Sequence, residues 1–332
     1  MTVRTSEGDT EDSPTPAPQP KPRKSRKARI LDVVRWLAIV LVVVFAAKAL
    51  ADNWSEFWRT LSDVAWQSSV LSLAALVLSI MVSTWGWQVL VDDLGKPIGY
   101  VRGAQICLVG SLGKYVPGSV WAYLLQMELG RKAGLARARI FSGSLIQLGV
   151  GVVSALVVSL LAAPAVFSHS PRAMWLFVLI PVGLALLHPR VLTWGTSLIL
   201  RVLRRPPLER PLTWGVVLKT FGASTLAWVL QGVHLWLLAN SVGAPGFSGF
   251  ILCVGAMAVA MTVGTFAFIL PSGLGVREVA QVAVLTASGL TVGQATAFAV
   301  ASRVMFTVAD LLTAGGAAGT AWLAKRRRVA TA

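Results

Sequence analysis

Long apolar runs recur along the chain, and each has the length of a helix that crosses a lipid bilayer. Five of them can each span about 30 Å of hydrocarbon, and a shorter run at 173–188 is a marginal sixth. The five long runs occupy residues 33–51, 68–91, 140–163, 216–241 and 296–323. This pattern predicts an all-α polytopic membrane protein with about six full spans.

Two further apolar segments are interrupted by proline and glycine. The first, 103–127, is broken at Pro117-Gly118, and the second, 249–290, is broken by the sequence LPSGLG at 270–275. Proline removes a backbone donor and glycine loosens the backbone, so each break favours two half-helices that turn back on each other. We therefore expect two re-entrant hairpins, the first entering from the cytoplasmic side and the second from outside.

The two broken segments align with each other at an offset of 154 residues. Val109-Gly110-Ser111 precedes Pro117 at the spacing at which Val263-Gly264-Thr265 precedes Pro271. One further residue of slip pairs Gly134-Leu135 with Gly289-Leu290. The chain is thus expected to contain two copies of a unit made of a span, a broken hairpin and a span.

The same offset carries the spans of the first unit onto those of the second. It places 68–91 on 222–245 and 140–163 on 294–317. Flanking charge indicates that span 68–91 runs from outside to inside, whereas span 216–241 runs from inside to outside. We therefore predict inverted-topology repeats, at about 68–163 and about 216–323.

Composition and charge support the membrane class. The chain has 55% hydrophobic and 13% charged residues, a mean hydropathy of +0.69 and a net charge of +16. Of its 30 Lys and Arg residues, 24 lie on one set of flanks, so topology explains the charge better than nucleic-acid binding does. The positive-inside rule makes those flanks cytoplasmic, places both termini in the cytoplasm of a protein of the cell membrane, and puts the loop 52–67 outside.

Three parts follow along the chain. Residues 1–29 are expected to form a disordered cytoplasmic tail, 30–326 the transmembrane domain and 327–332 a C-terminal tail. The basic run KPRKSRKAR in the first tail is either a topology signal or a contact with anionic headgroups. A cytoplasmic interfacial helix is expected at 189–205, although 173–205 could also form one span or two.

Five charged residues fall well inside the predicted membrane segments, away from the segment ends, where charge is costly and therefore points to function. They are Lys114, Arg277, Glu278, Arg303 and Asp310. In each hairpin the second half-helix begins at the break, and a cation, Lys114 or Arg277, lies within one turn of that start. A helix N-terminus with a nearby cation is an arrangement that binds anions. Because three cations face two carboxylates, an anionic ligand is favoured. The alternatives are that the Arg303–Glu278 pair is purely structural, and that the breaks are plain kinks beside a snorkelling Lys114.

Catalytic and metal-binding patterns are not evident in the sequence. Cys107 and Cys253 lie in apolar segments without partner spacing, and the three histidines are scattered. The pair Asp92-Asp93 is expected to be a solvated loop. We expect no cofactor, no metal site and no enzymatic activity.

Two motifs resemble a known family. The stretches GSLGKYVPGSVWAYLLQMELGRKAGL (110–135) and LPSGLGVREVA (270–280), with Arg303 in the last span, resemble the flippase-like transmembrane region of lysylphosphatidylglycerol synthases. The likeness is closest to stand-alone, actinobacterial-type members, and it covers roughly 33–323. It implies substrate-binding roles for the matched positions: Lys114, Tyr115, Pro117, Gly118, Trp121, Pro271, Gly273, Gly275, Arg277, Glu278 and Arg303. Asp310 joins them from the charge argument.

The resemblance implies a module that moves or presents an anionic or modified phospholipid, or a polyprenyl-phosphate-linked intermediate. Full-length synthases append a soluble aminoacyl-transferase domain, whereas this chain stops at Ala332, so lysine transfer is not expected. The expected function is a flippase or transporter whose partners are membrane lipids with anionic headgroups. The alternative is a non-transporting scaffold for a separate glycosyltransferase or synthase. A lipid-phosphate enzyme would need more carboxylates or a nucleophile, and the substrate, direction, energy source and oligomeric state stay open.

Overall fold

A computed structural model describes residues 48, 51, 54–116, 120–162, 179–208, 210–240, 246–267 and 270–330. Every regular element in these residues is a helix. The predicted tail 1–29, most of the first apolar run and the break at Pro117-Gly118 lie outside the described residues.

Five helices are long and apolar enough to cross a membrane. They are α3 (Trp66–Asp93), α6 (Arg137–Ser159), which the short turn η2 (Leu160–Ala162) extends, α10 (Trp214–Ala239), α11 (Gly246–Phe266) and α13 (Val292–Ala330). Four of them coincide with predicted spans, which confirms an all-α, multi-pass membrane protein. The fifth, α11, is the first arm of the second broken segment. It is longer than a half-helix because its sequence stays apolar over 21 residues.

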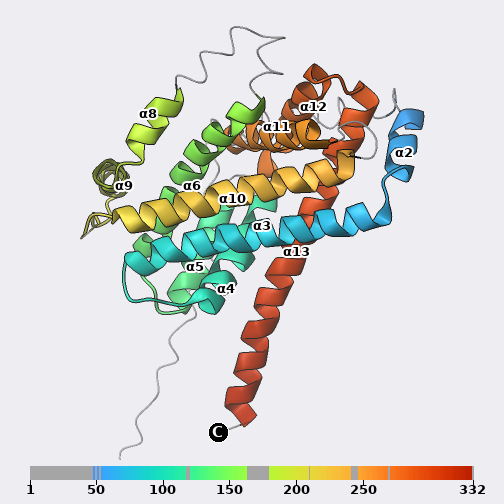
Figure 1. The fold of residues 1–332 in the computed structure, drawn as a ribbon. Helices are drawn as coiled ribbons and strands as arrows, with labels where there is room; N and C mark the ends of the chain where they lie inside the picture. The colour runs from blue at the N-terminus through green and yellow to red at the C-terminus, as the bar shows by residue number, and fades with distance from the viewer. Residues whose placement is uncertain are drawn as a thin grey trace, which may run out of the picture.

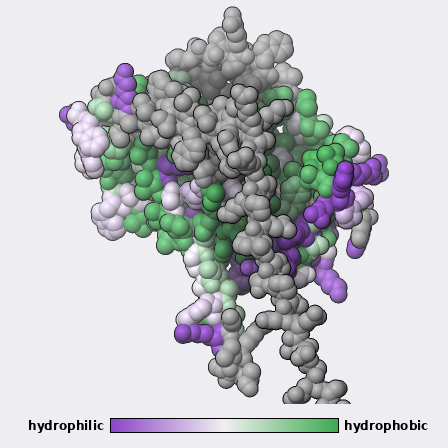
Figure 2. All heavy atoms as spheres, turned by 180° about the vertical axis from the view of Figure 1, so that it is seen from behind, coloured by the Kyte–Doolittle hydropathy of each residue, from purple (hydrophilic) through white to green (hydrophobic). Residues whose placement is uncertain are grey.

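The outer surface suits a lipid environment. Large apolar side chains on the spans are exposed, among them Leu71 (57%), Leu218 (61%) and Leu311 (57%). On the face shown in Figure 2, hydrophobic side chains cover much of the described surface, and strongly hydrophilic residues gather mainly toward its margins. Such a surface is unfavourable in water but matches hydrocarbon.

The first broken segment folds back on itself. It consists of α4 (Tyr100–Ser111), the short turn η1 (Leu112–Tyr115) and α5 (Val120–Lys132). A side chain added at Gly110 would lie 3.0 Å from the Cα of Gln126, and one at Gly113 would lie 2.7 Å from the backbone of Trp121. The glycines therefore allow the two arms to pack at backbone distance.

The second broken segment does the same. Its arms are α11 and α12 (Val276–Ala287), joined through η4 (Pro271–Gly273). A side chain added at Gly264 would lie 3.0 Å from the Cβ of Arg277, and one at Gly273 would lie 2.8 Å from the carbonyl oxygen of Gly264. Whether either hairpin re-enters one leaflet stays a prediction.

The paired dipeptides Gly134-Leu135 and Gly289-Leu290 both follow the second arm of a hairpin. Gly134 follows α5 with φ +79°, and the Leu135 N–H donates to the carbonyl of Gly130 at 2.9 Å. Gly289 follows α12 with φ +97°, and Leu290 bonds back five residues in the same way at 3.3 Å. Each end has the six-to-one bond of a Schellman cap, which needs a left-handed residue.

Helices α3 and α10 lie side by side and antiparallel through the middle of the molecule (Figure 1). Hydrogen bonds join them along their length: Ser72 donates to the His234 carbonyl at 3.0 Å, Ser79 to the Ala227 carbonyl at 3.0 Å, and Thr220 back to the Gly86 carbonyl at 3.4 Å. Small and hydroxyl side chains let membrane helices approach closely. The two helices that begin the predicted units are thus antiparallel, as inversion requires.

The contacts between hairpins and last spans correspond in the two units. Helix α4 packs on α13 and α11 packs on α6, so each hairpin's first arm lies against the last span of the other unit. Within each unit, the last helix also packs on the hairpin's second arm, α5 on α6 and α12 on α13. These are the contacts expected of two copies related by a two-fold axis, and they support the predicted repeat.

Three shorter helices complete the described fold: α2 (Trp54–Ser62), α8 (Leu179–Leu186) and α9 (Pro189–Val202). The prediction of a loop at 52–67 was wrong for its greater part, because α2 is an amphipathic helix that packs on α13. The helix expected at 189–205 is present as α9, which begins at Pro189 after the His188 cap. Of the marginal span 173–188, only the residues from 179 onward are described.

Candidate functional site

The tips of the two hairpins meet. The turn η1 contacts η4, and α13 passes beside η1. Next to this contact lies a cavity of about 630 Å³, whose wall is built by α3, α4, α5, α6, α10, α11, α12 and α13 together with the two tips. Both predicted units therefore contribute to one cavity.

Six of the predicted site residues line this cavity: Lys114, Tyr115, Gly273, Arg277, Arg303 and Asp310. Much of the cavity wall is apolar, with side chains such as Leu148 and Phe306. A cavity of this size and mixed character fits the head end of an amphiphile.

Asp310 joins the last span to the tip of the first hairpin. Its carboxylate is 4% exposed and accepts from the Lys114 ammonium at 2.6 Å and from the Tyr115 hydroxyl at 2.6 Å. Lys114 is 34% exposed toward the cavity. An ion pair with a buried carboxylate therefore replaces the alternative of a lysine that merely snorkels.

Glu278 and Arg303 form the second charged group, as expected from the sequence. The Arg303 guanidinium lies 3.3 Å from one carboxylate oxygen of Glu278 and donates to the Ser272 carbonyl at 3.0 Å. The other oxygen of Glu278 accepts from the Gly275 N–H at 2.6 Å. This carboxylate therefore occupies the start of α12, the position at which we expected an external anion to bind. Ser272 also has φ +51°, an unusual value that keeps its carbonyl in reach of Arg303.

Arg277 is paired with neither of these carboxylates. It is 4% exposed, lines the cavity, and forms no ion pair with a described carboxylate. One guanidinium nitrogen donates to the Ser302 hydroxyl at 3.3 Å, the guanidinium lies 4.1 Å from the centre of the Phe306 ring, and the Nε atom has no hydrogen-bond partner. A buried cation with an unused donor is suited to binding an anion.

Comparison with known proteins identifies a family. Residues 35–313 match the family described as "Lysylphosphatidylglycerol synthase TM region". The chain belongs to this family. No curated protein sequence matches the chain. The family links the protein to lipid handling in a membrane.

The other residues that the family motifs implied lie around the cavity or outside the described part. Trp121 is half-exposed, and neither it nor Gly275 nor Glu278 lines the cavity. The Gly275 N–H donates to Glu278, which pairs with Arg303. The backbone of Pro271 belongs to η4. Pro117 and Gly118 lie outside the described residues. The substrate-binding role of every position that the motifs implied stays a prediction.

The far end of the first hairpin carries a separate charged cluster. Hydrogen bonds from Arg131 and Arg137 lower the pKa of the exposed Glu128 carboxyl to about 2. This carboxylate stays ionised at ordinary pH and ties α5 to the start of α6.

Sequence reasoning missed a set of polar side chains within the spans. Their signal was available, because a glutamine or a histidine inside an apolar run is rare and needs a partner. His234 accepts or donates at both ring nitrogens, to Ser72 at 2.6 Å and Ser302 at 3.0 Å, and it is fully buried. The missed residues are Ser72, Ser79, Ser83, Gln126, Gln147, Gln231, His234, Gln281 and Ser302.

Proposed function

We propose that the protein is a lipid flippase or transporter for an anionic or phosphate-bearing amphiphile. Phospholipids, aminoacylated phospholipids and polyprenyl-phosphate intermediates belong to this class. The observation that carries the proposal is Arg277, a buried cation without a described carboxylate partner on the wall of a cavity of about 630 Å³. A phosphate headgroup would supply the missing charge and accept from the free Nε donor.

The two paired cations give the site a means of responding to the ligand. A phosphate that enters the cavity competes with Asp310 for Lys114 and with Glu278 for Arg303, because all of these except Glu278 line the wall. Asp310 and Arg303 lie on the last span, whereas Lys114 and Glu278 lie on the two hairpins. Exchange of partners therefore loosens the hairpins from that span. Such a change suits alternating access by motion of one unit against the other.

Transport rather than catalysis is proposed for a chemical reason. Within the described residues no group of three or more His, Cys, Asp or Glu side chains is placed to hold a metal ion. The serine–histidine cluster Ser72–His234–Ser302 is fully buried and lines neither described cavity. The proposed partners are membrane lipids with anionic headgroups, and nucleic acid is not among them.

Reconstitution in liposomes tests the proposal. A fluorescent anionic phospholipid is placed in the membrane, and its exchange between leaflets is followed with wild-type protein, with Arg277→Met and with Arg59→Met. Arg59 is the matched control because it is exposed on α2, away from the cavity. We expect wild-type and Arg59→Met to exchange lipid alike, and Arg277→Met to be at least about tenfold slower.

Two results contradict the proposal. Exchange by Arg277→Met at the wild-type rate would exclude the anion site. Exchange by the wild type no faster than in protein-free liposomes would exclude transport. Co-purification of a glycosyltransferase or synthase in that second case would support the alternative, a non-transporting scaffold.

A further inference from the structure

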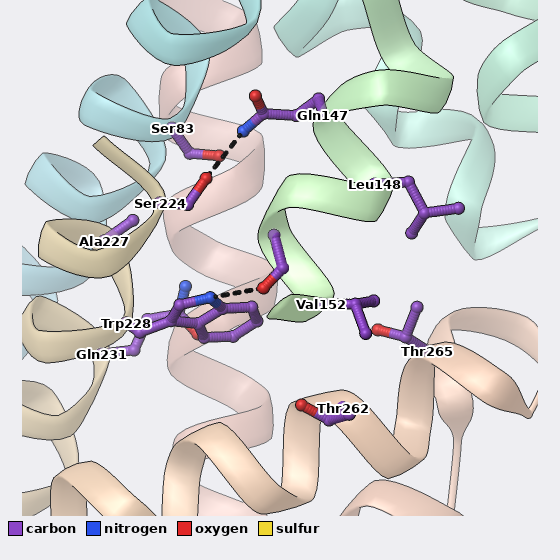
Figure 3. Close-up of a pocket in the computed structure, with 11 residues that line it drawn as sticks. Ser83, Gln147, Leu148, Val152, Ser224, Ala227, Trp228, Gln231, Thr262 and Thr265 are labelled. Carbon is purple, nitrogen blue, oxygen red and sulfur yellow. Dashed lines mark hydrogen bonds between the residues drawn. The ribbon is translucent and has the colours of Figure 1, made fainter. Parts of the chain in front are cut away.

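A second, smaller cavity of about 170 Å³ adjoins the first. It lies among α3, α6, α10 and α11, and it shares Ser83, Leu148, Gln231 and Thr265 with the larger cavity (Figure 3). A ligand bound by the cations of the larger cavity can therefore extend into the smaller one.

Two hydrogen-bond acceptors of residues that line the smaller cavity have no donor. The amide nitrogen of Gln147 donates to Ser224 at 3.4 Å and that of Gln231 donates to Ser79 at 3.1 Å. Each nitrogen makes one such bond, and the carbonyl oxygens Oε1 of both glutamines are buried and have no hydrogen-bond partner. Gln231 itself is 9% exposed. Buried acceptors without donors are costly, so two beside one cavity favour a ligand that donates.

Two threonines add to this excess of acceptors. Thr262 donates its hydroxyl proton to the Ala258 carbonyl at 2.7 Å, and Thr265 donates to the Met261 carbonyl at 2.8 Å. Their oxygens can therefore only accept from the cavity. A ligand in this cavity therefore needs hydrogen-bond donors for these oxygens, and it can also accept from the hydroxyl groups of Ser83 and Ser224.

Charge and shape narrow the ligand further. None of the described residues that line the smaller cavity is charged. A primary ammonium would be buried there without a counter-ion and close to the three cations of the larger cavity, which disfavours it. Trp228 projects into the cavity from α10 with its indole N–H engaged by the Gly151 carbonyl at 3.0 Å, and its ring remains as an apolar wall (Figure 3). Apolar cavities of about 150 Å³ hold a six-membered ring.

We propose that the smaller cavity binds an uncharged polyol ring, such as a cyclitol or a hexose, that is attached to the phosphate of the transported lipid. The inference rests on the proposed function, because the phosphate is held by Arg277 and its neighbours. The amides of Gln147 and Gln231, whose oxygens are buried beside the cavity, turn toward it and accept from ring hydroxyl groups, and the C–H face of the ring packs on Trp228. Either a glycerophospholipid or a polyprenyl phosphate can carry such a ring.

Binding of lipid pairs that differ only in the polyol tests this inference. Purified protein in detergent is titrated with phosphatidylinositol and phosphatidic acid, and with a polyprenyl phosphohexose and the bare polyprenyl phosphate. Bound lipid is counted by native mass spectrometry. We expect at least one polyol lipid to bind about tenfold more tightly than its bare phosphate, and the preferred pair identifies the lipid source.

Variants show whether the glutamines cause the preference. In the double variant Gln147→Met with Gln231→Met, the ratio of the two affinities should fall to near one. Gln105→Met is the matched control, because Gln105 lies on α4, bonds Thr320 and lines neither cavity. This control should keep the wild-type ratio.

The outcomes separate this inference from the proposed function. Equal binding of both members of each pair by the wild type overturns the polyol site. If Arg277→Met still weakens both members, the anion site stands. A double variant that keeps the preference, or tighter binding of phosphatidylethanolamine than of phosphatidylinositol, also overturns the polyol site. A wild type that binds neither pair overturns both proposals.

Discussion

Replacing Arg277 by methionine separates a binding role from a structural one, because a binding role predicts a small change in stability and a large change in lipid affinity, whereas a structural role predicts the reverse. Methionine has a similar length and no charge, so it keeps much of the packing on Phe306. The variant removes the hydrogen bond to Ser302 and the contact of the guanidinium with the Phe306 ring, at 3.3 Å and 4.1 Å in the wild type.

The terms of stability nearly cancel. A hydrogen bond to a charged group contributes about 1.5–3 kcal/mol, and a cation over an aromatic ring contributes about 0.5–2 kcal/mol. Against them stands a cost of about 2.5–3.5 kcal/mol for a charge at membrane depth. With no described carboxylate paired to Arg277, we expect the free energy of unfolding to change by no more than about 2.5 kcal/mol.

Binding should change much more. One charge-assisted bond to a phosphate contributes about 1.5–3 kcal/mol, so its loss lowers affinity about 10-fold to 100-fold. Thermal unfolding in detergent and lipid titration on the same preparation measure both quantities. Unchanged lipid affinity together with a loss of about 3–5 kcal/mol of stability, as a broken buried pair shows, would refute the reasoning.

Three further substitutions test parts of the site and its frame. Asp310→Asn should raise the affinity for anionic lipid in the same titration, because the lysine and tyrosine of the first hairpin lose their carboxylate; a lower affinity would contradict the competition. Gly273→Ala should lower the unfolding temperature more than Gly246→Ala: both have positive φ (+65° and +72°), but only an added Cβ at Gly273 meets backbone, at 2.8 Å. Equal effects would place no tight contact at the tip. Gln281→Leu should stabilise by about 1–3 kcal/mol because both its buried amide atoms are unpaired, whereas Gln126→Leu should destabilise because it loses bonds to Ser144 and Cys107; the same sign for both would contradict this.

Elements set by local pattern were predictable from the sequence. The spans follow from apolar length, and the turns of both hairpins follow from glycines that permit backbone contact. The helix C-caps at Gly134 and Gly289 follow from the internal sequence repeat. The Arg303–Glu278 ion pair was also predictable, because burial of charge demands a partner.

Other features depended on contacts between distant segments or on a signal that was overlooked. Nothing in the sequence assigned Lys114 to Asp310, which lies on another helix, or brought Gln147 and Gln231 to one cavity. Glu278 stands three residues after Gly275, the spacing of a capping carboxylate, and that spacing could have shown that the helix start is already occupied. The sequence did not predict helix α2, because the charged residues of 52–67 were interpreted as indicating a loop.

The position of a bound phosphate tests the central claim most directly. An experimental structure of the protein in a bilayer containing anionic lipid should show the phosphate between the hairpin tips, within hydrogen-bonding distance of the Arg277 guanidinium. A cavity that holds only acyl chains, or a hairpin that passes straight through the membrane and leaves the tips apart, would contradict the account.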